Sequence, residues 1–403
     1  MKVERLVGPI RTYAWGSHHF IANLQGRRAP TAEPEAELWL GAHPGAPSEV
    51  EDVGQRTLLN DFIDEDRERA LGARVTARFD GELPFLLKVL AAAQPLSLQA
   101  HPSRSQAEDG FAREQAAGIP ISAAERNYKD RSPKPELIVA LTPFFALSGF
   151  RHPATTAQLL RALEVPELEP TIAHLAEPEP SRALSDAFSS LMTLSPSERS
   201  ALALKTLEGA KRQAEIAGPF QKEFAWAVRL GALYPGDIGI VGALLLNLVE
   251  LAPFQGIFLP AGNLHAYLEG SGIEIMAASD NVLRGGLTPK AVNVPELLRV
   301  LDFSELAPKP LSPRVLASGE RVYETPSEEF RLSYVPVEGT VALTARESPE
   351  IVLVTAGELN LESSTGSLAL LSGDAAFIPA SERGYVLRGT GTAFRATVGE
   401  TTS

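Results

Sequence analysis

The chain has 403 residues, no cysteine and a formal net charge of −13 at pH 7. This length predicts two or three domains, because a single hydrophobic core rarely grows so large. Without cysteine there is neither a disulfide framework nor a thiolate metal site, so a metal would take His, Asp, Glu, Gln or backbone oxygen ligands. The acidic balance argues against nucleic acid as the main partner, since phosphate backbones require a basic surface.

Neither a membrane segment nor a secretion signal is expected. No apolar run approaches the ~20 residues that cross a bilayer. The N-terminal stretch MKVERLVGPIRTYAWG lacks the apolar core of a signal peptide. We therefore expect a cytoplasmic protein with a small-molecule partner, and the sequence leaves its oligomeric state open.

The first 150 residues are expected to be mainly strands. Short apolar runs broken by Gly and Pro favour strands within 37–45, 83–92, 95–103 and 135–150. The polar, Ala- and Glu-rich stretch 104–128 favours a short helix followed by a loop.

The character of the sequence changes at about residue 154. Residues 154–233 are rich in Ala, Leu and Glu, and their apolar positions recur at spacings of three and four, which predicts helices. Ser195 followed by Pro196 is a plausible helix start, with Ser as the cap and Pro in the first turn. We expect a helical insertion here, after which residues 236–258 return to strand-like runs.

The C-terminal part beyond about residue 310 predicts a meander of short strands and contains an internal repeat. FLPAGNLHAYLEG at 258–270 aligns with FIPASERGYVLRG at 377–389, with matching Phe, Pro, Ala and final Gly. His265 falls opposite Gly384. We interpret the repeat as two barrels of one design, in which the turn is scaffold and only the first barrel keeps its histidine. The second barrel is predicted to bind no metal.

Four side chains offer nitrogen and oxygen donors that suit zinc. The order Gly, then Pro-x-Gly-x-x-His at 256–265 resembles the second motif of the cupin superfamily of small jelly-roll barrels, whose histidine faces a metal. Gln99 and His101 lie two apart in a predicted strand and so share a face. Glu136 opens another apolar strand. One Gln, two His and one Glu leave an open position for water or substrate on Zn²⁺. Each residue alone also has an ordinary structural explanation.

A longer match points to one family. Residues 265–290 read HAYLEGSGIEIMAASDNVLRGGLTPK and closely resemble the signature of type I mannose-6-phosphate isomerase (phosphomannose isomerase). Ala278 is a tolerated variant, and Gly285 stands where the signature has Ala. ELWLGAHP, LPFLLKVL, LSLQAHP and KPE follow in the family's order, so the resemblance extends from the N-terminus to about residue 300. It implies one zinc ion per chain with the ligands Gln99, His101, Glu136 and His265.

The resemblance also agrees with a three-part architecture. We expect a mainly β fold with an α-helical insertion, made of two cupin-like jelly-roll barrels plus a helical domain. Residues 1–153 and 234–310 would form the catalytic domain, 154–233 the helical insertion and 311–403 a degenerate C-terminal barrel.

The implied reaction is an aldose-ketose isomerisation that interconverts mannose 6-phosphate and fructose 6-phosphate through a cis-enediol. The family's second signature departs at one point, because Ser132 and Pro133 stand where it has Asn-His before Lys-Pro-Glu. Any proton-transfer role of that histidine cannot be carried over. An isomerase of another aldose or sugar phosphate, or a non-catalytic sugar-phosphate-binding protein, stays open as an alternative.

Three residues are predicted to be catalytic. Arg284 would stabilise negative charge that develops on oxygen, and Lys134 and Glu274 are candidates for proton transfer. Glu274 lies in an apolar run, where a carboxylate is costly unless it is paired or used. The alternatives are a helical salt bridge from Arg284 to Asp280 and an outward-facing Glu274. The general base stays open among Glu274, Lys134, Asp280 and metal-bound water, and a hydride shift is not excluded.

Three further residues are predicted to bind the substrate. Lys88 interrupts LPFLLKVL, where an ammonium group calls for an anion, and Tyr267 shares a strand face with His265. Asp280 is the third, and His43 is a weaker candidate. The remaining histidines are expected outside the site: His18, His19, His152 and His174.

Overall fold

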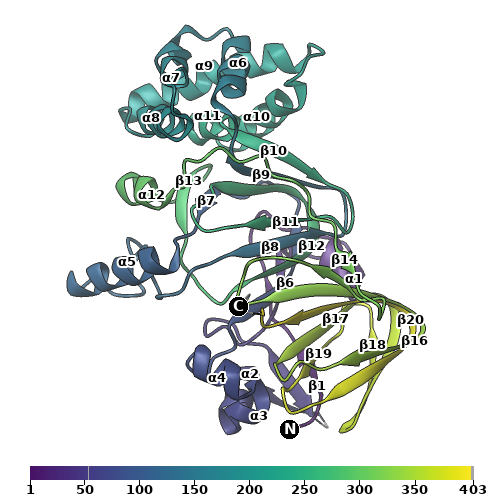
Figure 1. Cartoon of the computed structure of the whole chain (residues 1–403). Helices are drawn as coiled ribbons and strands as arrows, with labels where there is room; N and C mark the ends of the chain where they lie inside the picture. Colours follow the sequence, from purple (N-terminus) through teal and green to yellow (C-terminus); the bar gives the residue numbers. More distant parts are fainter. Residues whose placement is uncertain (53, 401–403) are drawn as a thin grey trace.

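The computed structural model describes residues 1–52 and 54–400. Their strands form two ten-stranded sheets, and a group of helices lies at one end of the molecule (Figure 1). Within these residues, no helix is both long and apolar enough to cross a membrane.

The first sheet carries the candidate site. Its strands are β2 (Ile10–Arg11), β3 (Glu37–Leu40), β6 (Phe85–Ala92), β7 (Leu98–Ala100), β8 (Glu136–Ala140), β9 (Phe144–Phe150), β10 (Leu246–Leu251), β11 (Gly256–Leu259), β12 (His265–Ala277) and β13 (Leu283–Gly286). Strand β12 is central, because its first part pairs with β7 and β9 and its second part lies between β6 and β8. The strands predicted in the first 150 residues and the helix predicted after residue 104 are confirmed.

The second sheet combines the C-terminal meander with strands from the N-terminus. It contains β1 (Glu4–Val7), β4 (Glu49–Asp52), β5 (Gln55–Leu58), β14 (Arg314–Val315), β15 (Arg321–Tyr323), β16 (Arg331–Thr344), β17 (Glu350–Ser363), β18 (Gly366–Leu371), β19 (Ala375–Ile378) and β20 (Gly384–Thr397). Strand β1 pairs with β19 on one side and with β4 on the other. The two ends of the chain therefore meet in one sheet.

The two sheets share one hydrophobic core. Alternate residues of β6 and β12, such as Val89 and Ile273, pack into a buried cluster with Phe377 and Phe394 of the second sheet. The residues between them, such as Lys88 and Glu274, point to the other face because side chains alternate along a strand. One face of the first sheet thus supplies the core, and the other supplies the site.

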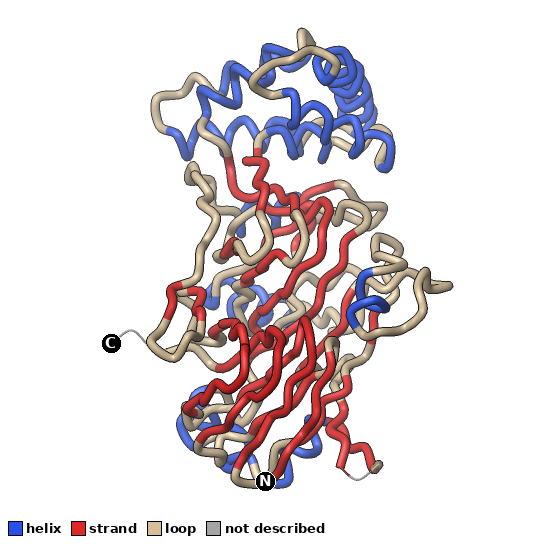
Figure 2. Tube along the Cα trace, turned by 90° about the vertical axis from the view of Figure 1, so that its right-hand side faces the viewer, coloured by secondary structure: helices blue, strands red, loops and turns tan. Residues whose placement is uncertain are grey.

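Helices follow one another from residue 153 to residue 244 and form the end that is uppermost in Figures 1 and 2. They are α6 (Pro153–Ala162), α7 (Glu169–His174), α8 (Pro180–Met192), α9 (Pro196–Ala214), α10 (Gln221–Leu233) and α11 (Gly239–Leu244), with a 3₁₀ turn at Pro166–Leu168. The predicted start of α9 is confirmed, since Ser195 and Glu198 form a reciprocal capping box.

The strand-like run predicted from residue 236 is wrong in its first part. Residues 239–244 form helix α11, in which every residue is buried. Asp237 Oδ1 accepts a hydrogen bond from Gly239 N and so supports the start of this helix. A short, wholly apolar run has no polar face, so its periodicity cannot separate a buried helix from a buried strand.

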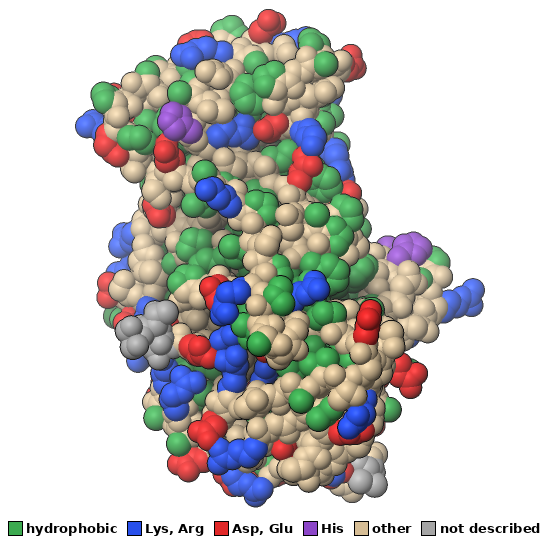
Figure 3. Space-filling view, turned by 45° about the vertical axis from the view of Figure 1, so that its right-hand side comes forward, with side chains coloured by type: hydrophobic (Ala, Val, Ile, Leu, Met, Phe, Trp, Pro, Cys, Tyr) green, Lys and Arg blue, Asp and Glu red, His purple; other side chains and the backbone are tan. Residues whose placement is uncertain are grey.

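The remaining helices lie outside this group. They are α1 (Phe20–Leu24), α2 (Leu59–Glu65), α3 (Arg67–Leu71), α4 (Ala73–Arg78), α5 (Arg104–Ala116) and α12 (Val294–Val300). The space-filling view shows Lys and Arg side chains interspersed with Asp and Glu over the face that it presents (Figure 3).

The internal repeat has a structural counterpart. In both copies a short strand, a turn and a long strand follow one another, β11 to β12 and β19 to β20. His265 and Gly384 are the first residues of the two long strands, and Gly270 and Gly389 have positive φ angles of 125° and 131°. Along the described strands the pairing orders are open and close no barrel, so the two jelly-roll barrels stay a prediction.

Candidate metal centre and surrounding site

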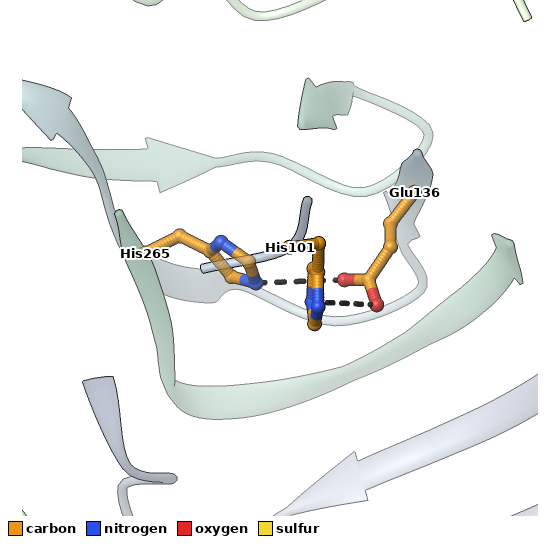
Figure 4. Close-up of side chains that lie close together, drawn as sticks. All are labelled: His101, Glu136 and His265. Carbon is orange, nitrogen blue, oxygen red and sulfur yellow. Dashed lines mark ion pairs between the residues drawn. The ribbon is translucent and has the colours of Figure 1, made fainter. Parts of the chain in front are cut away.

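Three predicted metal ligands meet at the ends of paired strands (Figure 4). His265 begins β12, Glu136 begins β8, and His101 directly follows β7. One possible ligand atom from each lies within 4.8 Å of the others, and all three side chains are buried. His101 Nε2 is 3.2 Å from Glu136 Oε1, and His265 Nε2 is 3.5 Å from Glu136 Oε2.

Backbone carbonyls determine which nitrogen of each imidazole ring carries a hydrogen. His101 Nδ1 lies 2.7 Å from the carbonyl oxygen of Asn281, and His265 Nδ1 lies 3.0 Å from that of Asn263. A carbonyl only accepts, so each Nδ1 carries a hydrogen, and in the neutral form of either ring Nε2 presents the lone pair. His265 Nε2 is buried without a hydrogen-bond partner. This is the arrangement that metal-bound histidines take, so the cluster fits a divalent ion such as zinc.

Gln99 lies beside this cluster. It belongs to β7, where it is paired with His265 of β12 and with Arg284 of β13. Residues directly opposite each other in antiparallel strands project their side chains to the same face. The side chain of Gln99 therefore lies on the face of His265, and its role as a fourth ligand stays a prediction.

Lys134 contacts the cluster from a loop. It was predicted to share a strand face with Glu136, but β8 begins only at Glu136. Its Nζ is nevertheless 2.5 Å from Glu136 Oε1 and 3.5 Å from His101 Nε2. The two prolines that flank Lys134 lack the N–H that a strand ladder uses, which accounts for the late start of the strand.

Charges inside the cluster favour the metal-binding protonation states. Burial opposes the charge of Glu136, but Lys134 and His101 outweigh it and hold the pKa of this carboxyl well below its usual range. Burial, together with Lys134, lowers the pKa of His101 to about 4. At neutral pH the cluster therefore contains a carboxylate and a neutral imidazole.

Buried ion pairs extend from the cluster along the same face of the first sheet. Lys88 and Glu274 are paired across β6 and β12, and Lys88 Nζ lies 2.9 Å from Glu274 Oε2 and 3.4 Å from Glu37 Oε1. Burial opposes the charge of Lys88, but Glu274 and Glu37 raise the pKa of its amine. Burial raises the pKa of Glu274 although Lys88 opposes this. The alternative that Glu274 faces solvent is wrong, because its residue is only 3% exposed.

Two residues beside Lys88, Glu37 and Trp39, were not predicted as part of the site. Glu37 accepts a hydrogen bond of 2.8 Å from Trp39 Nε1, and Trp39 is paired with Lys88 across β3 and β6. The only signal in the sequence is a carboxylate two residues before a tryptophan in a strand-like run.

Tyr267 lies next to the ligand cluster of His101, Glu136 and His265, as predicted. Its ring centroid is 6.1 Å from that of His265, and its hydroxyl is buried without a hydrogen-bond partner. Burial, Glu274 and Glu136 raise the pKa of the phenol well above its usual value. Tyr267 therefore offers a neutral O–H donor inside the site.

Arg284 and Asp280 do not form the salt bridge considered as an alternative. Arg284 lies in strand β13 rather than in a helix, and none of the ion pairs among the described residues includes it. Asp280 instead contacts His43, with Oδ1 3.2 Å from Nε2. Burial lowers the pKa of the Arg284 guanidinium. The positive charge of Arg284 is thus left available for another anion.

The histidines predicted outside the site are not part of the cluster. His18 contacts the carbonyl oxygen of Thr31, and His152 caps helix α6 and lies near Glu305. His19 precedes α1 and His174 ends α7. A separate cleft of about 530 Å³ beside α10 and β10 is lined by His152 and Arg151, and by none of the predicted site residues.

Family models match both ends of the chain. The model for the catalytic domain of type I phosphomannose isomerase matches residues 3–153, and the model for the cupin domain of mannose-6-phosphate isomerase matches residues 320–398.

Full-length relatives agree with these matches. The chain is 40% identical over 393 residues to mannose-6-phosphate isomerase of Escherichia coli, covering 96% of this chain and 98% of that one. A mutant of phosphomannose isomerase from Salmonella typhimurium superposes with a TM-score of 0.90 at 38% identity, covering 99% and 100% of the two chains. A zinc-bound mannose 6-phosphate isomerase structure gives a TM-score of 0.89 at 38% identity with the same coverage. The chain belongs to the type I mannose-6-phosphate isomerase (phosphomannose isomerase) family.

Proposed function

We propose that this chain is an aldose-ketose isomerase that interconverts mannose 6-phosphate and fructose 6-phosphate and binds one zinc ion. The observation that carries the proposal is the buried ligand cluster of His101, Glu136 and His265, in which His265 Nε2 has no hydrogen-bond partner among the described residues. Membership of the family supports the substrate and the metal, since a structurally similar mannose 6-phosphate isomerase is zinc-bound.

The zinc ion would be held by His101, Glu136, His265 and Gln99, and when bound it supplies a Lewis acid that polarises a sugar oxygen. Arg284 would place its unpaired positive charge near the oxygen that becomes negative as a proton leaves the neighbouring carbon. Fixed charges of this kind stabilise a transition state without reorganisation.

The proton transfer is proposed to run through a cis-enediol. A base removes the proton from carbon 2, beside the carbonyl, and returns it to carbon 1, while the hydroxyl proton on the oxygen of carbon 2 passes to the oxygen of carbon 1, so that the aldose becomes the ketose. Glu274 and Lys134 are the buried candidates, whereas the side chain of Asp280 is 47% exposed. Tyr267 would donate its free O–H to the sugar, and Lys88 and Asp280 would bind further substrate oxygens.

The replacement of Asn-His by Ser132 and Pro133 is the observation that favours a second candidate function. A changed proton donor or pocket wall suits an isomerase that prefers another aldose or sugar phosphate. A non-catalytic sugar-phosphate-binding protein is the weaker alternative, because it would not need zinc ligands, an unpaired arginine and buried lysines together.

The domain division belongs to the proposal as well. We propose a cupin-like catalytic domain from residues 1–153 and 234–310, a helical insertion at 154–233 and a second, degenerate jelly-roll barrel at 311–403. The open pairing of the strands leaves the barrels as a proposal. A cytoplasmic location and the lack of a nucleic-acid partner are likewise expectations from the sequence.

The test is proton NMR of the zinc-loaded protein with mannose 6-phosphate in D₂O. We expect fructose 6-phosphate to form, with deuterium entering at carbon 1 or 2. Conversion without deuterium would contradict the enediol route in favour of a hydride shift or a shielded proton. No conversion by protein with bound zinc would overturn the assigned substrate, and other aldoses and their phosphates would be assayed next.

A further inference from the structure

A network of hydrogen bonds joins two loops that are about 150 residues apart in the sequence. The carboxylate of Asp130 accepts from Ser132 N at 2.9 Å, from Ser279 Oγ at 2.8 Å and from Asn281 Nδ2 at 3.0 Å through one oxygen. Its other oxygen accepts from Asp280 N at 2.8 Å. We call Asp130, Ser279 and Asn281 the loop clasp.

The side chain of Asn281 is fixed at both ends of its amide. Its Oδ1 accepts from Lys129 N at 2.8 Å, and its Nδ2 donates to the carbonyl oxygens of Asp130 and Ser132 at 3.0 Å each. The residue has 0% exposure, so these bonds do not compete with water. The amide therefore holds the backbone of Asn281 in one place.

The backbone of Asn281 contacts the ligand cluster of His101, Glu136 and His265. The carbonyl oxygen of Asn281 is the acceptor 2.7 Å from His101 Nδ1. For His265 the acceptor is the carbonyl of Asn263, only two residues earlier on the same segment. The orientation of His265 is thus a local matter, whereas that of His101 depends on where a loop 180 residues away is held.

His101 has two possible neutral tautomers, and its surroundings offer a partner to each. A hydrogen on Nδ1 is bonded to Asn281, whereas a hydrogen on Nε2 would be bonded to Glu136 Oε1 at 3.2 Å. The second tautomer has no lone pair on Nε2 for a metal. It would also bring a lone pair on Nδ1 against the lone pairs of the Asn281 carbonyl. The Asn281 carbonyl therefore favours the first tautomer, as does Lys134 Nζ, which lies 3.5 Å from His101 Nε2 and can only donate.

We propose that Asp130 and Asn281 are positioning residues for the metal centre. The loop clasp keeps the Asn281 carbonyl on His101 Nδ1 and so keeps His101 in the tautomer that binds a metal through Nε2. The inference rests on the proposed function only in that the cluster binds zinc, and it does not depend on which sugar is converted.

The principal test compares Asn281→Ala with Asn247→Ala. Asn247 is a matched control, because its amide nitrogen also donates to three backbone carbonyls and joins the segments near Gly149 and Leu306. Nitrogen-15 NMR of the metal-free proteins would report the tautomer of each imidazole ring. Competition with a chelator would measure zinc affinity.

For Asn281→Ala we expect a hydrogen on Nε2 of His101 in a substantial fraction of molecules and no change at His265. Zinc affinity should fall by about 10- to 100-fold, the usual loss when the partner of a metal-binding histidine is disturbed. Asn247→Ala should lower the melting temperature and leave both the tautomer and zinc affinity unchanged. Ser279→Ala removes the bond from Ser279 Oγ to Asp130, a longer one to the carbonyl oxygen of Ser132 and the acceptor of Asn281 N. Because it leaves the Asn281 amide in place, it should give a smaller shift in the same direction as Asn281→Ala, even if the latter folds poorly.

A lower melting temperature in Asn281→Ala and Ser279→Ala, with tautomers and zinc affinity as in the parent protein, would leave the loop clasp a purely structural feature and overturn the inference. Because the tautomer is read without metal or substrate, this failure is distinct from failure of the isomerase proposal. A parent protein that binds zinc without converting mannose 6-phosphate would affect only the latter.

Discussion

Arg284 is the residue whose surroundings most clearly call for an external anion. It is half-buried in β13, it is the strand neighbour of Gln99, and burial alone lowers its pKa. A positive charge that is partly removed from water without a carboxylate partner is costly, and a substrate that becomes negative in the transition state would offset this cost.

We predict that Arg284→Ala retains zinc and loses turnover. Removal of one preorganised charge or donor typically lowers kcat by about 10²- to 10³-fold, and Arg284→Lys should recover part of this because it keeps the charge. The measurements are zinc content and steady-state kinetics. His265→Ala is the control, since it should lose zinc and activity together. Normal turnover in Arg284→Ala would exclude the role assigned to the guanidinium.

Much of the site was predictable at this scale because its residues carry chemistry in their side-chain type. A His or Glu in an apolar strand is unusual enough to be noticed, which is how His101, Glu136 and Glu274 were identified. Asn281 and Glu37 were not, because their importance comes from partners that only the fold brings near them. Lys134 lies close to the ligand cluster as predicted, but it does so from a loop and not from a shared strand face.

At the scale of elements, the second sheet depends on a buried charge network. Arg395 of β20 contacts Glu350, the first residue of β17, at 2.5 Å and Glu320, just before β15, at 3.2 Å. Tyr385 also donates to Glu350 at 2.9 Å. One guanidinium thus ties together segments from three parts of the sheet.

We predict that Arg395→Met lowers the free energy of unfolding by about 3–5 kcal/mol, because it leaves buried carboxylates without their partner. The matched control is Arg388→Met on the same strand, whose exposed ion pair with Glu362 should contribute less than about 1 kcal/mol. Urea denaturation measures both. Equal losses of unfolding free energy in the two variants would show that the buried network stabilises the sheet no more than the exposed ion pair does.

Helices and strands could be predicted where the sequence separates a polar from an apolar side or where a capping motif marks the start. Helix α9 has polar and apolar sides and begins with a capping box, so both its type and its start could be read. Helix α11 is apolar on all sides, and strand pairings such as β1 with β19 join residues more than 360 positions apart. Such pairings leave no local pattern in the sequence.

At the scale of the whole molecule, the shared core couples the two sheets. Phe377 and Phe394 pack with Val89 and Ile273 in one cluster. A loss of stability in the second sheet should therefore also destabilise the sheet that carries the site. A titrating group in the second sheet should therefore be visible in the unfolding of the entire described structure.

Glu320 provides such a group. Burial opposes its charge, but Arg395 and a 2.6 Å hydrogen bond from Ser333 outweigh this and lower the pKa of the carboxyl. In the unfolded chain its pKa is about 4.3. Because the folded pKa is the lower one, the stabilisation is fully present above about pH 4.3 and is lost as the pH falls through the folded value.

We therefore predict that Glu320→Gln melts at a lower temperature than the parent protein at pH 7, and that the difference shrinks below about pH 4.3. The amide cannot gain or lose a proton, so only the parent protein loses this contribution on acidification. Melting curves from pH 7 to pH 3 would measure the difference, with Glu362→Gln, at the exposed ion pair of β17 and β20, as the control. A difference that grows on acidification would mean that the folded state raises the pKa of Glu320, so that its burial outweighs Arg395.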